Sequence, residues 1–155
     1  MTDSTEVSVD IAAGPTTLYD MISDVTRMGE WSPENVGCTW LGGATGPVVG
    51  AKFKGRNQRG WRKWSTVNEV VEADPGKAFA FRTSSLGMAV AQWSYRFDGD
   101  DQAGRCTVTE SWTDERGKLI LVAGGVATGV SDRATHNRAG MQQTLDAVKV
   151  AAEAG

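Results

Sequence analysis

The sequence lacks the features that mark several large classes of protein. No apolar run approaches the roughly 20 residues that a membrane-spanning helix needs, so we expect no membrane span. The first ten residues, MTDSTEVSVD, are polar and acidic, unlike a secretory signal peptide. The net charge of −3 argues against a dedicated nucleic-acid binder, for which a basic balance is typical. We therefore expect a soluble, cytoplasmic protein with no nucleic-acid partner.

Residues for metal, redox and nucleophilic chemistry are scarce. The chain has one histidine, His136, and two cysteines, Cys38 and Cys106, which we predict to be free thiols in a reducing compartment. At 100° per residue His136 lies about 140° from Met141 around a helix, so it should face solvent, which argues against a catalytic dyad or His-based metal site. The CxxC, HExxH, GxSxG and Walker motifs are missing. We predict no metal and no cofactor.

Alternation of apolar and polar residues dominates the middle of the chain. A period of two is typical of strands that are half-buried in a sheet, and short turn signals such as Asp74-Pro75-Gly76 separate the segments. The predicted strands cover residues 6–11, 36–41, 51–57, 61–73, 77–85, 88–97 and 105–112. Strands at this hairpin spacing predict an antiparallel meander.

Segments with helical features lie toward both ends of the chain. Pro15 starts a predicted helix, and residues 24–31 predict a second short helix that ends before Pro33. Residues 119–130 are small and apolar, which indicates a short helix or a mobile cover. Residues 131–152 predict one long amphipathic helix. Its inward face would carry Ala134, Asn137, Met141, Leu145, Val148 and Ala152.

This order of elements, together with particular residues, resembles a known superfamily. The residues are Pro15 to Asp24, Met28 to Pro33, Gly50 to Phe53, Trp64, Val67, Val71, Asp74 to Gly76, Phe79 to Phe81, Trp93 to Tyr95, Thr107 to Glu110, Asn137, Met141 and Leu145. Over nearly its whole length the chain resembles the helix-grip superfamily. That superfamily includes START lipid-transfer domains, polyketide cyclase/dehydrase-like proteins and plant pathogenesis-related allergens.

The resemblance implies a single α+β domain over residues 1–155. Its fold would be a curved antiparallel sheet of about six or seven strands wrapped around the long C-terminal helix, with two short helices after the first strand. Such a sheet cannot fill its own concavity with one helix, and an apolar pocket with a few polar groups suits a small hydrophobic ligand. The alternative is that the aromatic side chains, six tryptophans among them, pack solidly against the helix. The predicted ligand-binding residues are Phe53, Trp64, Phe81, Trp93, Tyr95, Glu110, Trp112, Asn137 and Met141.

Glu110 is the most informative single residue. Strand alternation places it beside Val108 and Trp112 on the inward face, where a carboxylate must be paired or protonated. Its polar companions inside would be Tyr95, Asn137 and, depending on register, Gln92 or Arg82. Glu110 then either orients a keto or polyphenolic ligand or acts on it as acid or base, with Tyr95 and Arg82 as further catalytic candidates. The alternatives are a structural ion pair or hydrogen bond, or a position at the rim that faces water.

Three functions follow from the resemblance. The first is binding or transport of a small hydrophobic ligand (a lipid, isoprenoid or polyketide-like molecule) between sheet and helix. The second is a polyketide cyclase, aromatase or dehydratase, working by positioning and one or two acid or base groups. The third is a partner-binding protein of the toxin-like or quinone-chaperone-like kind. The sequence leaves the oligomeric state open.

Basic residues cluster in one hairpin of this otherwise acidic protein. They are Lys52, Lys54, Arg56, Arg59, Arg62 and Lys63. One interpretation is transient contact with an anionic membrane surface or an acidic partner during ligand transfer. The other is that these side chains form only the solvent face of a hairpin whose opposite face lines the core.

Overall fold

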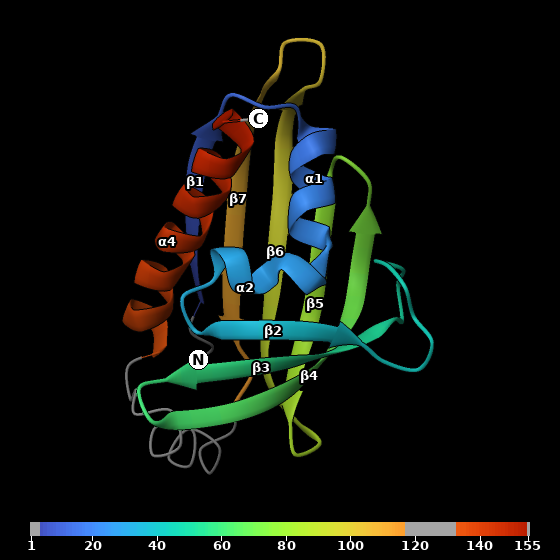
Figure 1. Ribbon diagram of the computed structural model, residues 1–155, viewed down its shortest axis with the longest axis vertical. Helices are drawn as coiled ribbons and strands as arrows, with labels where there is room; N and C mark the ends of the chain where they lie inside the picture. Colours follow the sequence, from blue (N-terminus) through green and yellow to red (C-terminus); the bar gives the residue numbers. More distant parts are fainter. Residues whose placement is uncertain (1–3, 117–132, 155) are drawn as a thin grey trace.

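A seven-stranded antiparallel sheet forms the body of the molecule in the computed structural model, which describes residues 4–116 and 133–154 (Figure 1). The strands are β1 (Ser4–Ile11), β2 (Asn35–Trp40), β3 (Lys52–Arg59), β4 (Arg62–Asp74), β5 (Ala78–Ser85), β6 (Met88–Asp100) and β7 (Arg105–Asp114). Their order in the sheet is β1-β7-β6-β5-β4-β3-β2. The predicted meander is therefore present, and the first strand pairs with the last one at the far edge.

Helices cover one face of this sheet. They are α1 (Pro15–Ser23), the 3₁₀ helix η1 (Val25–Arg27), α2 (Met28–Trp31) and α4 (Arg133–Ala154). Pro15 occupies the first turn of α1, where its missing N–H leaves no hydrogen bond unmade. The second short helix predicted over residues 24–31 is η1 followed by α2. The predicted segment 119–130 and the predicted first residue of the long helix, Ser131, lie outside the described residues.

The sheet is strongly bent. Register shifts between Asn35 and Gly37 in β2 and between Val70 and Glu72 in β4 mark irregularities of the β-bulge kind, which bend and twist a strand. As a result β2, β3 and β4 turn across the lower ends of β5 to β7 (Figure 1). The concave face so formed is closed by α1 and α2 on one side and by α4 on the other.

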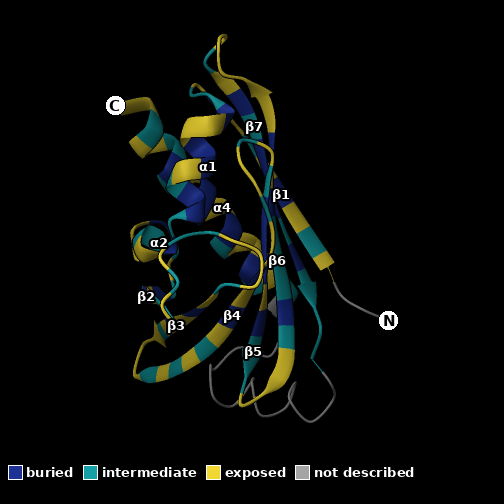
Figure 2. Cartoon of the chain, turned by 90° about the vertical axis from the view of Figure 1, so that its right-hand side faces the viewer, coloured by how far each residue is buried: buried dark blue, intermediate teal, exposed yellow. Residues whose placement is uncertain are grey.

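The long helix packs along the β1 edge of the sheet, with smaller contacts to β7, α1 and α2. Its predicted inward face is confirmed, because Met141, Leu145 and Val148 are fully buried and Asn137 is 7% exposed. Figure 2 shows that the buried residues of α1 and α4 lie on the sides turned toward the sheet. The predicted α+β helix-grip fold is therefore confirmed. Within the described ranges, no helix is long and apolar enough to cross a bilayer.

Candidate ligand-binding cavity

A cavity of about 320 Å³ lies between the concave face of the sheet, α2 and the first half of α4. All nine residues predicted to bind a ligand line it: Phe53, Trp64, Phe81, Trp93, Tyr95, Glu110, Trp112, Asn137 and Met141. They come from strands β3 to β7 and from α4, so the predicted strand parity is correct for each. That they contact a ligand stays a prediction.

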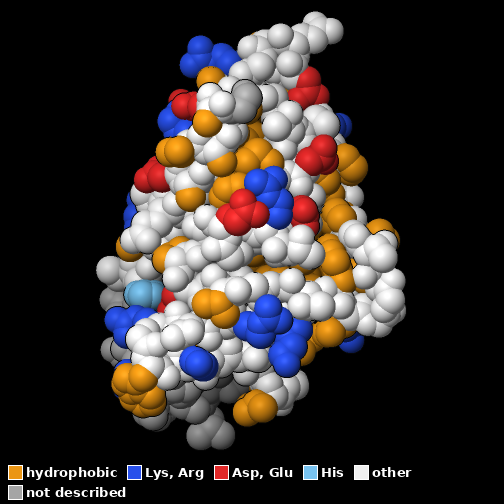
Figure 3. All heavy atoms as spheres, in the orientation of Figure 1, with side chains coloured by type: hydrophobic (Ala, Val, Ile, Leu, Met, Phe, Trp, Pro, Cys, Tyr) orange, Lys and Arg blue, Asp and Glu red, His pale blue; other side chains and the backbone are white. Residues whose placement is uncertain are grey.

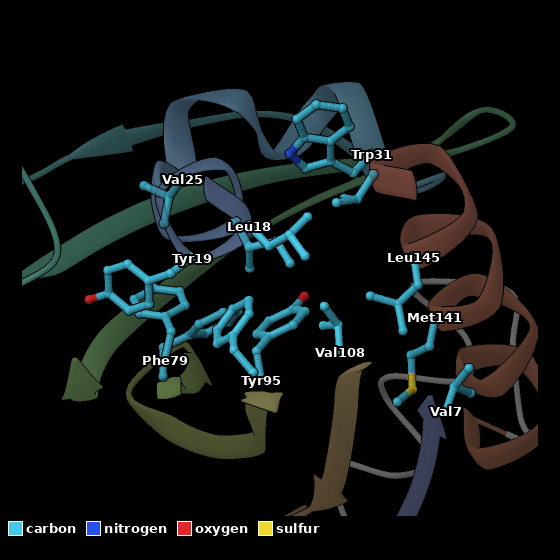
Figure 4. Close-up of a cluster of buried hydrophobic side chains, with 14 of the residues drawn as sticks. Val7, Leu18, Tyr19, Val25, Trp31, Phe79, Tyr95, Val108, Met141 and Leu145 are labelled. Carbon is cyan, nitrogen blue, oxygen red and sulfur yellow. The ribbon is translucent and has the colours of Figure 1, made fainter. Parts of the chain in front are cut away.

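Aromatic rings form the apolar wall of the cavity. Phe53 on β3 and Phe81 on β5 meet edge to face, with ring centroids 5.1 Å apart at 73°. Phe81 in turn is the cross-strand neighbour of Trp93 on β6. Edge-to-face packing is a favourable arrangement of aromatic rings, so this contact stabilises the wall. From the opposite side Met141 on α4 and Trp31 on α2 face the same interior (Figure 4).

Tyr95 and Glu110 form a buried polar pair within this apolar wall. The two residues are direct cross-strand neighbours on β6 and β7, and the Tyr95 hydroxyl donates a hydrogen bond of 2.8 Å to Glu110 Oε2. Burial raises the pKa of Glu110 from 4.5 to about 8, although the hydrogen bond from Tyr95 acts in the opposite direction. Burial and the neighbouring Glu110 raise the pKa of Tyr95 well above its usual 10. Both groups are therefore protonated at neutral pH.

A second polar region, which sequence reasoning missed, lies on the β3 to β5 side of the cavity. Asn68 is 3% exposed; its amide donates to the Phe53 carbonyl oxygen at 3.3 Å and accepts from the Thr83 hydroxyl at 2.7 Å. Nearby, Asn35 accepts a hydrogen bond from the Gly37 N–H at 2.9 Å. Asn68 thereby links β3, β4 and β5, and Asn35 closes a turn within β2. The sequence did contain a sign of this polar region, because Asn68 is a polar residue at an inward-facing position of a predicted strand.

The sequence matches one known family over nearly its whole length. Residues 2–153 match the family described as polyketide cyclase / dehydrase and lipid transport. The chain belongs to that family. Both roles in the description concern small molecules of a hydrophobic kind, which confirms the predicted class of function: ligand binding or polyketide cyclisation.

One solved structure supports membership in this family, and others share the fold. The chain is 30% identical to a Polyketide_cyc-like protein of Corynebacterium glutamicum, over 96% of this chain and 90% of that one, with a TM-score of 0.65. It is 17% identical to the Zhui aromatase/cyclase of Streptomyces sp. R1128, over 99% and 94%, with a TM-score of 0.67. It is 15% identical to the di-domain ARO/CYC StfQ of the steffimycin pathway, with a TM-score of 0.73, over 99% of this chain but only 51% of that one. The last two similarities show the fold alone. No curated protein matches the sequence significantly.

One catalytic candidate does not reach the cavity of this family member. Arg82 lies between the inward-facing Phe81 and Thr83, so its own side chain points to the outer face of β5 and is exposed. There its guanidinium lies 3.4 Å from Glu115. Gln92, its cross-strand neighbour on β6, does not line the cavity either. Strand alternation therefore removes Arg82 from the candidate site, and Tyr95 is the polar partner of Glu110.

The prediction that His136 faces solvent is wrong. His136 lines the cavity, and its Nε2 lies 3.3 Å from Glu34 Oε2, with 31% of the histidine side chain exposed. The turn between α2 and β2 covers this flank of α4, where Pro33 lies against Gly140. Helical periodicity alone could not reveal a covering segment that is about a hundred residues away in sequence.

Both cysteines are held in their protonated form. Cys38 and Cys106 are buried free thiols. Burial raises the pKa of Cys38 above its usual value and that of Cys106 to about 11. A thiol of this kind is a poor nucleophile, because the thiolate is the reactive species. Among the described residues no group of three or more His, Cys, Asp or Glu side chains is placed to hold a metal ion.

Proposed function

We propose that the protein binds and carries one small hydrophobic molecule, such as a lipid, isoprenoid or polyketide-like compound, in the cavity between the sheet and α4. The observation that carries this proposal is the cavity of about 320 Å³, walled mainly by aromatic and aliphatic side chains. Small-molecule sites are typically concave, mostly apolar and about 300–1,000 Å³ in volume, with a few polar groups that fix orientation. The Tyr95–Glu110 pair supplies such polar groups here.

Native mass spectrometry of the protein purified from its own cells tests this proposal. We expect an adduct of one small molecule per chain that organic extraction removes. Val90→Trp places an indole in the lining of the cavity and should abolish the adduct. Val150→Trp makes the same change at an exposed position of α4, 71% exposed, and should retain it. An adduct that survives Val90→Trp but not Val150→Trp would contradict the proposed location.

We propose further that the basic hairpin β3–β4 contacts an anionic membrane surface transiently. Lys52, Lys54 and Arg56 are exposed on the outer face of β3. At the tip of the hairpin Trp61 is 79% exposed, and the Arg62 guanidinium lies 4.3 Å from the centre of its ring. Figure 3 shows basic and hydrophobic side chains side by side over this lower part of the molecule. Anionic lipids attract basic residues, and tryptophan favours the membrane interface.

Vesicle binding tests this contact. Binding should rise with the fraction of anionic lipid, and the double change Lys52→Gln and Lys54→Gln should weaken it. Lys149→Gln on α4 is the matched control and should leave it unchanged. Binding that ignores anionic lipid would end the proposal. A cytoplasmic location, which the two buried free thiols support, is part of the same proposal.

The buried pair also supports a second candidate function, a cyclase or dehydratase. Glu110 and Tyr95 would serve as its acid groups, since both are protonated and line the cavity. Incubation with a poly-keto chain, followed by analysis for a newly closed ring, tests this role. The proposal requires product from the unaltered protein and none from Glu110→Gln.

A further inference from the structure

Glu110 has one carboxyl oxygen without a hydrogen-bond partner. The side chain is 2% exposed and its Oε2 accepts from Tyr95, but Oε1 has no partner among the described residues. An unpaired polar atom in the interior costs about 1–3 kcal/mol. Such atoms are rare in folded proteins, so each one requires an explanation. A polar atom of a ligand beside Oε1 would supply the missing partner.

The charged groups around the cavity do not neutralise this carboxyl group. Among the described residues, the other titratable groups that line it are His136, which pairs with Glu34, Arg116, which pairs with Asp114, and the neutral thiol of Cys38. No salt bridge to Glu110 forms within the described ranges. Without a cation beside it, the buried carboxyl group keeps its proton at neutral pH, consistent with a pKa of about 8.

The number of protons in the pair determines what it offers to a ligand. A protonated Glu110 and Tyr95 carry two O–H groups between them, and only one hydrogen can lie in the single bond that joins their oxygens. Whether Tyr95 donates to Glu110 or Glu110 donates to Tyr95, the second O–H group does not take part in this bond. The pair therefore presents a hydrogen-bond donor to the cavity, and it carries no charge.

A second unsatisfied donor lines the same cavity. The Trp31 indole N–H is buried and has no partner within the described part of the chain. Trp31 on α2 and Tyr95 on the sheet approach the interior from opposite sides (Figure 4). Glu115 also has an oxygen without a hydrogen bond, but its carboxylate lies 3.4 Å from the Arg82 guanidinium, and Glu34 lies 3.3 Å from His136 Nε2. The two polar groups of the described wall that lack a partner, the Glu110–Tyr95 pair and the Trp31 indole N–H, are thus both hydrogen-bond donors.

We propose that the Glu110–Tyr95 pair donates a hydrogen bond to the carbonyl oxygen of an uncharged hydrophobic ligand, a ketone, quinone or ester. The pair thereby selects such a ligand over a hydrocarbon or a carboxylate of the same shape. The hydrocarbon leaves the buried donor unpaired, and the carboxylate brings a charge into an apolar site where the described residues place no salt bridge partner for it. This inference rests on the proposed function and adds the chemical class of the ligand.

Three probes built on one ring system test the inference: fluorene, fluorenone, which adds one carbonyl group, and fluorene-9-carboxylate, which adds a charged group. We expect fluorenone to bind at least about tenfold more tightly than either of the others at neutral pH. Above the pKa of Glu110, about 8, its affinity should fall because only the protonated pair donates. The fall should end at the affinity of fluorene, because the ionised pair still binds the ring system without the hydrogen bond. The affinity for fluorene should not follow this profile.

Two variants separate the roles of the proton and the side chain. Glu110→Gln keeps an acceptor for Tyr95 and a donor for the ligand, so it should keep the preference for fluorenone and lose the pH dependence. Glu110→Leu should lose both. Glu115→Gln is the matched control, because Glu115 does not line the cavity, and it should behave like the unaltered protein. Circular dichroism confirms that each variant is folded, and the pH profile of the unaltered protein needs no variant.

Equal affinity for fluorene and fluorenone would overturn the inference and leave the proposed function standing. A preference for fluorenone that persists in Glu110→Leu would overturn it as well. If none of the three probes binds at any pH, both the inference and the proposed function are contradicted.

Discussion

The indole rings of Trp93 and Trp112 lie side by side on the wall of the cavity, with ring centroids 6.5 Å apart across β6 and β7. Any molecule that enters the cavity changes their surroundings. Intrinsic fluorescence should therefore respond to an added hydrophobic ketone such as decan-2-one, and Trp112→Phe should reduce that response. Trp61→Phe is the matched control, because Trp61 is 79% exposed and does not line the cavity. A response that depends on Trp61 instead would place the ligand on the surface.

The raised pKa of Glu110 makes the stability of the protein depend on pH. Between its unfolded value of 4.5 and its folded value of about 8, the folded state holds one proton that the unfolded state has released. The free energy of unfolding should fall as pH rises through this window, by roughly 1.4 kcal/mol per pH unit, and the fall should stop above the folded pKa. Urea unfolding of the protein and of Glu110→Gln isolates this contribution as their difference. A difference that stays constant with pH would mean that Glu110 is ionised in the folded protein.

Gly140 lies inside α4, where glycine is unfavourable. A Cβ atom added there would meet Pro33 Cγ at 3.6 Å, an ordinary contact. Gly140→Ala should therefore stabilise the protein by about 1 kcal/mol, through the higher helix propensity of alanine. The reverse change at an exposed position of the same helix, Ala139→Gly, should destabilise it by a similar amount. Thermal unfolding measures both, and a loss of stability in Gly140→Ala would show that Pro33 cannot accept the added methyl group.

The hydrogen bond from Thr83 to Asn68 holds the polar side of the cavity together. Thr83→Val keeps the shape of the side chain but removes the hydroxyl group that donates to the side-chain oxygen of Asn68, Oδ1, at 2.7 Å. We expect a loss of about 1–3 kcal/mol in the free energy of unfolding. Thr39→Val, at an exposed strand position, should change it by less than about 0.5 kcal/mol. Equal effects of the two changes would argue that the Asn68 network does not contribute to stability.

The periodicity of apolar residues in the sequence was sufficient to predict the sheet, the long helix and the nine named residues of the cavity wall. Strand alternation in β7 placed Glu110 inward, because it lies two residues from Val108 and two from Trp112, which are both buried. The same rule, applied to Phe81 and Thr83, would have excluded Arg82. The partner of Glu110 depended on strand register, which bulges shift and which no local pattern fixes.

Contacts between distant segments could not be predicted in this way. His136 is covered because the turn after α2 packs on α4, and the Asn68 network forms because β4 lies between β3 and β5. Both depend on how far the sheet bends. That curvature comes from bulges at particular residues, and its extent determines whether a cavity is left beside the helix.

Methionine methyl groups provide the most direct test of the central claim, that the hollow between sheet and helix holds the ligand. Met28 and Met141 line the cavity, whereas Met21 packs against the core outside it. In an NMR titration of methyl-labelled protein with fluorenone, the signals of Met28 and Met141 should shift and that of Met21 should stay in place. Shifts confined to surface residues, with Met141 unchanged at saturation, would contradict the account.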